Sequence, residues 1–148
     1  KTAYEIYQCD WSSDVCSSDL TTSCAPLASA FAIGGAEPAE ITRVTTVCGG
    51  IEIERPRRGR DILAAARASG GSIIASEDPL ILAERDALAR LEGVYAEPTS
   101  CAGAAALAQL ALTGAVGPDD LVMLVLTGTG LKDPGPVTDE QASRAEAT

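Results

Sequence analysis

The most ordered hydrophobic pattern in this chain covers residues 121–126, six apolar residues without interruption. The turn-forming residues 117–120 (GPDD) precede this run, and residues 127–130 (TGTG) follow it. A short, unbroken apolar run between turn signals predicts a strand buried on both faces, as in parallel sheets covered by helices. Ligands of such sheets bind beyond the carboxyl ends of the strands. Thr127 is therefore a candidate ligand position, although an ordinary strand with a glycine-rich turn gives the same pattern.

The rest of the chain alternates short apolar segments with helical periodicity. Strands are predicted over residues 72–76 and 94–96, and a strand or extended loop over residues 41–48. Helices are predicted over residues 24–33, 61–69, 78–92 and 101–112. Such alternation is typical of βα units around a mainly parallel sheet. The predicted fold class is therefore α/β, with three αβα layers.

Helix ends and helix faces can also be assigned from the pattern. Asp78 is predicted to cap the third helix with Pro79 at its first position, and Thr99 or Ser100 to cap the fourth. Ser23 is the predicted cap of the first helix. On the third helix, Glu84, Arg85, Asp86 and Arg90 are assigned to the wetter side, and the buried face to Leu80, Ala83, Ala87 and Leu91.

Composition limits the function classes. The chain has 148 residues, of which 46% are hydrophobic and 3% aromatic, so one domain with a core of Ala, Leu, Ile and Val is expected. The net charge of −10 argues against nucleic acid as a partner. The sequence contains no run of about eighteen apolar residues and no secretory signal pattern, so neither a membrane segment nor export is predicted.

The cysteine and histidine counts bear on metals and redox state. Five cysteines occur at irregular spacing and there is no His, which argues against a zinc site, a disulfide framework and a Cys–His or Ser–His–Asp catalytic arrangement. Reduced, mostly buried thiols in a cytoplasmic protein are the prediction. The basic cluster at residues 55–60 (RPRRGR) is interpreted as a solvated loop, with a phosphate or nucleic-acid site as the alternative.

The first twenty residues differ from the rest. Residues 10–20 (DWSSDVCSSDL) match, at all eleven positions, the in-frame translation of a sequencing-library adapter. Residues 1–20 are therefore interpreted as an assembly artefact and predicted to be disordered, with a disordered polar leader as the alternative. Residues 21–136 are the expected folded part, and residues 137–148 a flexible tail.

Residues 126–133, LTGTGLKD, resemble the C-terminal signature LTGHGLKD of threonine synthase, with Thr129 in the place of the His. That family comprises pyridoxal-phosphate enzymes of the tryptophan synthase β-subunit fold (fold type II). The resemblance implies that Thr127 hydrogen-bonds the pyridine nitrogen of the cofactor, with Gly128 beside it. A hydroxyl is too weak an acid to protonate that nitrogen firmly. Residues 97–100 (EPTS) also resemble an element of this group whose Glu lies near the ring, which makes Glu97 a further candidate.

Two elements of this chemistry are missing from the sequence. A Lys must form the Schiff base and a glycine-rich loop must hold the phosphate. The only Lys after residue 20 is Lys132, within the GLKD motif. The resemblance therefore covers roughly residues 21–136 and corresponds to the C-terminal portion of the enzyme, which is not catalytic alone. Strands left without partners predict that the isolated chain is poorly soluble or partly molten.

Three functional interpretations follow. The first is a fragment of threonine synthase, a lyase of threonine biosynthesis that converts O-phosphohomoserine and water to threonine and phosphate, with an amino-acid substrate and a full-length enzyme that can be a homodimer. The second is a threonine or serine dehydratase or another lyase of the same fold. Those enzymes usually show segments like SGGN or SGE where this chain has TGTG, which favours the first. The third is a non-catalytic small-molecule-binding α/β module.

Overall fold

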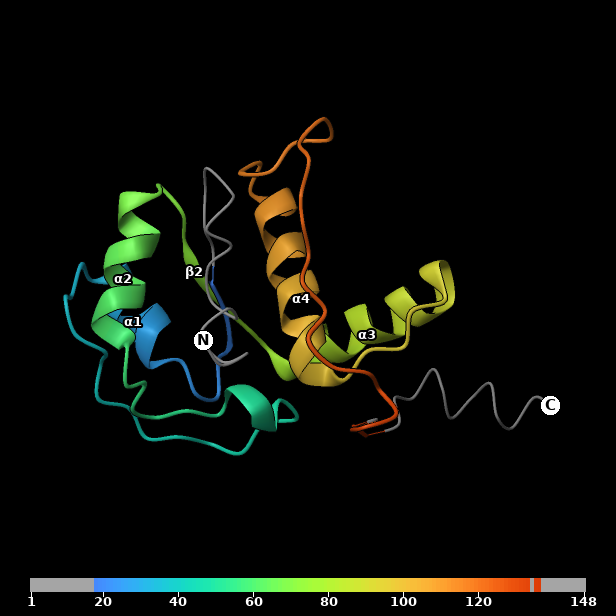
Figure 1. Cartoon of the computed structure of the whole chain (residues 1–148), viewed down its shortest axis with the longest axis horizontal. Coiled ribbons are helices and arrows are strands. Elements are labelled where there is room, and N and C mark those ends of the chain that lie inside the picture. Colours follow the sequence, from blue (N-terminus) through green and yellow to red (C-terminus); the bar gives the residue numbers. More distant parts are fainter. Residues whose placement is uncertain (1–17, 134, 137–148) are drawn as a thin grey trace.

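The computed structural model describes residues 18–133, 135 and 136, and Figure 1 shows the chain. Two strands, four α-helices and one 3₁₀ turn are formed within these residues. In chain order they are β1 (Ser18–Thr21), α1 (Pro26–Ala32), η2 (Gly49–Ile51), α2 (Gly59–Ala68), β2 (Ile73–Ser76), α3 (Asp78–Glu92) and α4 (Pro98–Leu112). Each predicted α-helix is present to within a few residues, and β2 occupies the strand predicted over residues 72–76. Within the described residues, no helix has the length and hydropathy needed to cross a membrane.

The sheet consists of β1 and β2, which pair in parallel with Thr21 opposite Ser76. Helices α1 and α2 lie on one side of this pair, and α4 lies on the other (Figure 1). A crossover through α1 and α2 joins the two strands, as parallel pairing requires. The predicted α/β class with a parallel sheet between helices is confirmed. Residues 41–48 form an extended loop, the second of the two predicted alternatives.

The N-terminal prediction needs a correction. Residues 18–20 were assigned to a disordered segment, but they form most of β1, and the Leu20 side chain is 6% exposed. Strand pairing uses backbone N–H and C=O groups, which every residue here carries. Residues 18–20 can therefore pair with β2 even if they derive from an adapter sequence. Residues 1–17 lie outside the described residues, as does the tail predicted over residues 137–148.

Two clusters of buried Ala, Leu, Ile and Cys residues make up the core. No buried residue in either is aromatic, in keeping with the composition. The first cluster lies between the sheet and the α1–α2 pair and contains Leu20, Ala25, Leu27, Ala30, Ile62, Leu63, Ala66 and Ile73. The second lies where α3 and α4 meet and contains Cys48, Ile81, Ala96, Cys101, Ala102 and Ala105. The second cluster supports the segment that carries the candidate site.

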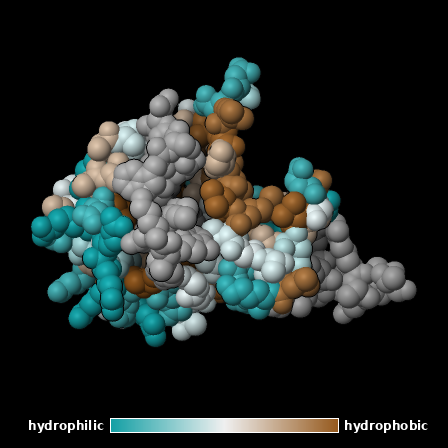
Figure 2. Space-filling view, viewed as in Figure 1, coloured by the Kyte–Doolittle hydropathy of each residue, from teal (hydrophilic) through white to brown (hydrophobic). Residues whose placement is uncertain are grey.

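The strand predicted over residues 121–126 is not formed. The segment runs alongside α4 in Figure 1 without a strand partner among the described residues. Leu121, Met123 and Val125 are 101%, 74% and 59% exposed, and Figure 2 shows hydrophobic surface gathered on this side of the molecule. A strand exists only where a neighbouring strand supplies hydrogen-bond partners. The two-stranded sheet lies on the other side of α4, so it supplies none.

The helix starts differ from the predicted caps. Ala25 and not Ser23 precedes α1, with Pro26 in its first turn as predicted. Asp78 is the first residue of α3 and Glu77 precedes it. The Asp78 carboxylate does not cap its own helix because it accepts three hydrogen bonds from other segments. They come from Thr21 Oγ1 (2.9 Å), Thr46 Oγ1 (2.6 Å) and Val47 N (2.9 Å).

The buried face of α3 was also assigned wrongly. Ile81 and Arg85 are its buried residues, at 0% and 1% exposure, whereas Leu91 is 67% exposed. Arg85 can be buried because its guanidinium is paired: Nη2 lies 2.8 Å from Asp86 Oδ1, and Nη1 donates to the Pro136 carbonyl at 3.0 Å. A charge enters a protein interior only with such partners. Arg85 thereby ties the end of the described chain to α3.

Candidate functional site

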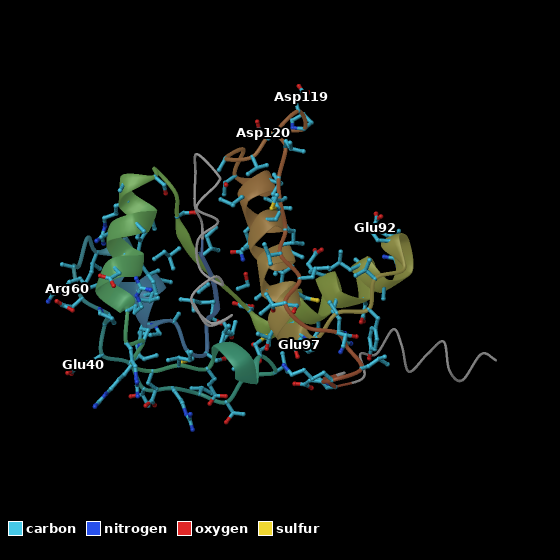
Figure 3. All side chains as sticks on the ribbon, viewed as in Figure 1. Glu40, Arg60, Glu92, Glu97, Asp119 and Asp120 are labelled. Carbon is cyan, nitrogen blue, oxygen red and sulfur yellow. The ribbon has the colours of Figure 1, made fainter. Side chains whose placement is uncertain are left out.

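Residues 128–130 lie against residues 95–97, and backbone contacts hold the two segments together. The strand predicted over residues 94–96 is present only as a single antiparallel bridge in this pairing. The two segments are joined by the Ala96–Thr129 bridge and by two backbone hydrogen bonds. Glu97 N donates to Gly128 O at 3.1 Å, and Gly130 N donates to Tyr95 O at 3.0 Å. Residues 128–130, here called the glycine motif, are therefore fixed to the start of α4, which lies near the labelled Glu97 in Figure 3.

Close approach explains the glycine at position 128. A Cβ on Gly128 would lie 2.2 Å from Glu97 Oε1 and 2.4 Å from Glu97 Cδ. Real Cβ atoms do not come so near, so only glycine lets this backbone pass the buried carboxylate. A Cβ on Gly130 would likewise meet the Tyr95 ring, at 2.6 Å.

Ser100 joins the two segments through its side chain. It is 3% exposed, and its Oγ accepts hydrogen bonds from Thr127 N at 3.0 Å and Gly128 N at 2.7 Å. The same oxygen lies 2.8 Å from Thr127 Oγ1. The predicted capping role is wrong: Glu97 precedes α4, and no side chain caps that helix. Thr99 does not cap it either, because its Oγ1 accepts from Gly50 N at 3.3 Å.

Glu97 is held by the lysine of the GLKD motif. The Glu97 side chain is 8% exposed, and Lys132 Nζ lies 3.2 Å from its Oε2. Lys132 itself is 71% exposed, so it covers the carboxylate from the solvent side. The three predicted site residues Thr127, Gly128 and Glu97 are thus brought together in space.

The residues present fit one end of pyridoxal phosphate. Thr127 offers a partly buried hydroxyl beside a glycine, which suits the ring nitrogen as a hydrogen-bond partner. Lys132 is the only lysine among the described residues, and its ammonium is engaged by Glu97. This part of the chain therefore fits the ring-nitrogen end of the cofactor, and offers neither a free amine for its aldehyde carbon nor a phosphate loop.

Other parts of the surface do not coincide with this site. A hollow of about 340 Å³ is lined by Pro38, Ala39, Glu40, Ile41, Glu54, Arg55 and Pro56, none of which belongs to the motif. Figure 3 shows Glu40 and Arg60 at the α1–α2 end, away from Glu97. Arg60 and Arg58 form ion pairs with Glu37 and Asp61, as expected of a solvated loop. No group of three or more His, Cys, Asp or Glu suited to a metal occurs in the described ranges.

Among the described residues, Cys24, Cys48 and Cys101 are buried and form no disulfide. Cys101 lies in the first turn of α4, next to Ser100. Burial raises the pKa of the Cys101 thiol from 9.0 to about 11. The thiol is therefore protonated at neutral pH. Since the thiolate is the reactive form, Cys101 is an unreactive packing residue.

We expect iodoacetamide at pH 8 to alkylate Cys101 about 100-fold more slowly in the folded chain than in urea, the effect of a two-unit pKa difference. The rate should rise with pH towards 11. The same shift lowers the stability of the fold between pH 9 and 11, since the unfolded thiol ionises first. Peptide mapping by mass spectrometry measures the rates, with urea-unfolded chain as the reference. Equal rates in both states would contradict a buried Cys101.

Comparison with known sequences decides the family. The sequence profile of the family described as "Pyridoxal-phosphate dependent enzyme" matches residues 19–128, well over half of the chain. The chain belongs to this family. The family depends on pyridoxal phosphate, as predicted from the LTGTGLKD resemblance, and Thr127, Gly128 and Glu97 all lie within the matched range.

Curated relatives narrow the resemblance. A threonine synthase of Methanosarcina acetivorans is 43% identical over 94 residues, which is 64% of this chain and 23% of that protein. A threonine synthase of Halalkalibacterium halodurans is 42% identical over 89 residues, 60% of this chain and 25% of that protein. The predicted similarity to threonine synthase is confirmed. The chain spans about a quarter of the length of these relatives.

A solved structure agrees on the fold. The structure of maize serine racemase matches 88% of this chain and 37% of its own, with a TM-score of 0.63 and 14% sequence identity. An identity this low supports the shared fold alone. The chain therefore has the fold of part of a pyridoxal-phosphate enzyme.

Proposed function

We propose that this chain is the C-terminal part of a threonine synthase, which converts O-phosphohomoserine and water to threonine and phosphate. The observation that carries the proposal is the Thr127 hydroxyl, held 2.8 Å from Ser100 Oγ beside Gly128 in a motif resembling that of the threonine synthases. The 35–43% identity to threonine synthases supports threonine synthase over other pyridoxal-phosphate enzymes of the family. The TGTG sequence favours it over a dehydratase.

Each site residue has a part in this proposal. Thr127 provides the hydrogen-bond partner of the ring nitrogen, and Gly128 leaves room for the ring and for the Glu97 carboxylate. Glu97, neutralised by Lys132, gives the site a fixed charge pair near the ring. Bound pyridoxal phosphate supplies electron withdrawal from the bonds at the substrate's α-carbon.

The chain alone is proposed not to be a catalyst. The amine that binds the cofactor's aldehyde and the loop that binds its phosphate would come from the part of the enzyme preceding this segment. The complete enzyme would act on a small amino acid in the cytoplasm, without nucleic acid or membrane as partners, and as a homodimer. The buried thiols of Cys24, Cys48 and Cys101, which form no disulfide among the described residues, support a reducing compartment.

A hybrid enzyme tests this proposal. Residues 19–136 of this chain replace the matching part of the Methanosarcina threonine synthase, and phosphate release from O-phosphohomoserine is measured. We expect activity from the hybrid and none from the chain alone. Thr127→Val should lower kcat about tenfold or more, the loss of one hydrogen bond worth ~1.4 kcal/mol.

The control is Thr113→Val, which removes an exposed hydroxyl bonded to Leu110 O at the far end of α4. It should leave kcat unchanged. A Thr127→Val hybrid that folds, binds pyridoxal phosphate and releases phosphate as fast as the unaltered hybrid would contradict the role of Thr127. Phosphate release by the chain alone would contradict its proposed dependence on a preceding segment.

A further inference from the structure

The hydrogen bonds around Ser100 assign the direction of the bond between the two hydroxyls. A serine oxygen has two lone pairs and one proton to donate. Thr127 N and Gly128 N both donate to Ser100 Oγ, at 3.0 and 2.7 Å, and so occupy the two lone pairs. The remaining contact of this oxygen is Thr127 Oγ1 at 2.8 Å. Ser100 can serve this contact only as the donor.

The burial of Ser100 strengthens the assignment. The residue is 3% exposed, so water does not readily replace any of these partners. A buried hydroxyl that kept its proton unused would lose roughly 1–3 kcal/mol. Cys101 N and Ser100 N both donate to Glu97 O, at 3.3 and 3.0 Å, which holds the first turn of α4 in place under the hydroxyl.

We propose that Ser100 is a positioning residue that donates its proton to Thr127 Oγ1 and so leaves the proton of Thr127 to be donated to the cofactor's ring nitrogen. This inference rests on the proposed function, and it goes beyond it by naming the residue that sets the direction of the hydrogen bond from Thr127 to the ring. A donor at this position matches a ring nitrogen that carries a lone pair. A ring nitrogen that already carries a proton would offer no acceptor for the Thr127 proton, and leaving a buried donor unpaired is unfavourable.

The first test needs no ligand. In the hybrid enzyme described above, freed of its cofactor, the ¹³Cβ isotope shift in mixed H₂O and D₂O reports how fast the Ser100 and Thr127 hydroxyl protons exchange. We expect the Ser100 hydroxyl, which donates inside the protein, to exchange at least about tenfold more slowly than the Thr127 hydroxyl, whose proton is left for a ligand. Slow exchange at Thr127 with fast exchange at Ser100 would overturn the assigned direction.

The second test adds pyridoxine 5′-phosphate labelled with ¹⁵N in the ring to the same cofactor-free hybrid, whose preceding part supplies the phosphate loop. The probe needs no lysine. At a pH where the free probe is protonated on its ring nitrogen, we expect the bound probe to show the ¹⁵N shift of an unprotonated ring. Ser100→Thr, which keeps the hydroxyl, should preserve this shift. Ser100→Ala should move the shift towards the protonated value, because Thr127 Oγ1 then has no donor partner at position 100 and gains by accepting a hydrogen bond from the ring.

The outcomes distinguish a failure of the positioning role of Ser100 from a failure of the proposed cofactor contact. A bound probe whose ¹⁵N shift is the same in the Ser100→Ala hybrid and in the unaltered hybrid overturns the positioning role. If the Ser100→Ala hybrid fails to fold, Ser100→Thr decides: a protonated ring bound to that variant, or to the unaltered hybrid, overturns the role. Hydroxyl exchange as expected, with no effect of the probe on Thr127 or Gly128, would instead contradict the proposed cofactor contact and leave the Ser100 bond intact.

Discussion

Gly128→Ala is expected to release the glycine motif from α4. The new Cβ would lie 2.2 Å from Glu97 Oε1, and Glu97 has little freedom to move because it is 6% exposed and paired with Lys132. Overpacking of this kind costs about 1–3 kcal/mol. In the hybrid enzyme described above, we expect the Gly130 amide, which donates to Tyr95 O, to exchange with solvent about 10–100-fold faster in the variant.

Gly117→Ala is the matched control, since a Cβ there would meet only Asp120 Oδ2 at the ordinary distance of 3.6 Å. It should leave the Gly130 exchange rate unchanged. Gly130→Ala should have a smaller effect than Gly128→Ala, because the opposing Tyr95 side chain is 39% exposed and can turn away. An exchange rate that Gly128→Ala leaves unchanged would contradict the close packing of this backbone against Glu97.

The second large effect concerns residues 121–126, here called the apolar strip. We expect the isolated chain to be poorly soluble, to bind hydrophobic dye and to unfold without a sharp transition, because this strip exposes contiguous apolar side chains. Replacing Leu121 and Met123 with Gln and Val125 with Thr should raise the soluble fraction about threefold or more and lower dye fluorescence.

Ile33→Gln combined with Leu91→Gln provides the control, because these side chains are 81% and 67% exposed but lie singly on other elements. Solubility should change little in this variant. A sharp, cooperative thermal transition from a monomer of the unaltered chain would contradict the expectation. Equal gains in solubility from the strip variant and the control would show that the strip has no special part.

The sequence was informative where local signals determine structure. Pro26 marked the start of α1, and Gly93, with a left-handed φ of 67°, ended α3 as predicted. The motif around Thr127 predicted candidate residues that the structure brings together from two distant segments. Glu97 was predicted in the same way, from the short motif EPTS at residues 97–100.

The missed features depend on partners that no local pattern contains. A hydroxyl in the first turn of a helix is the usual sign of a cap, but Ser100 serves the Thr127 and Gly128 amides, 27 and 28 residues away. Arg85 was assigned to solvent because its charge suggests exposure, and its burial depends on Asp86 and the Pro136 carbonyl. The strip at 121–126 has the composition of a buried strand, but it lacks a neighbouring strand among the described residues.

The central claim is that this segment completes a pyridoxal-phosphate enzyme, with Thr127 at the ring nitrogen. It is tested most directly by sequencing the source DNA upstream of the Thr21 codon. The account predicts an open reading frame that continues upstream and encodes a glycine-rich phosphate loop and a lysine for the cofactor. A genuine start codon close to Thr21, with no such segment before it, would contradict the account and favour a non-catalytic binding module.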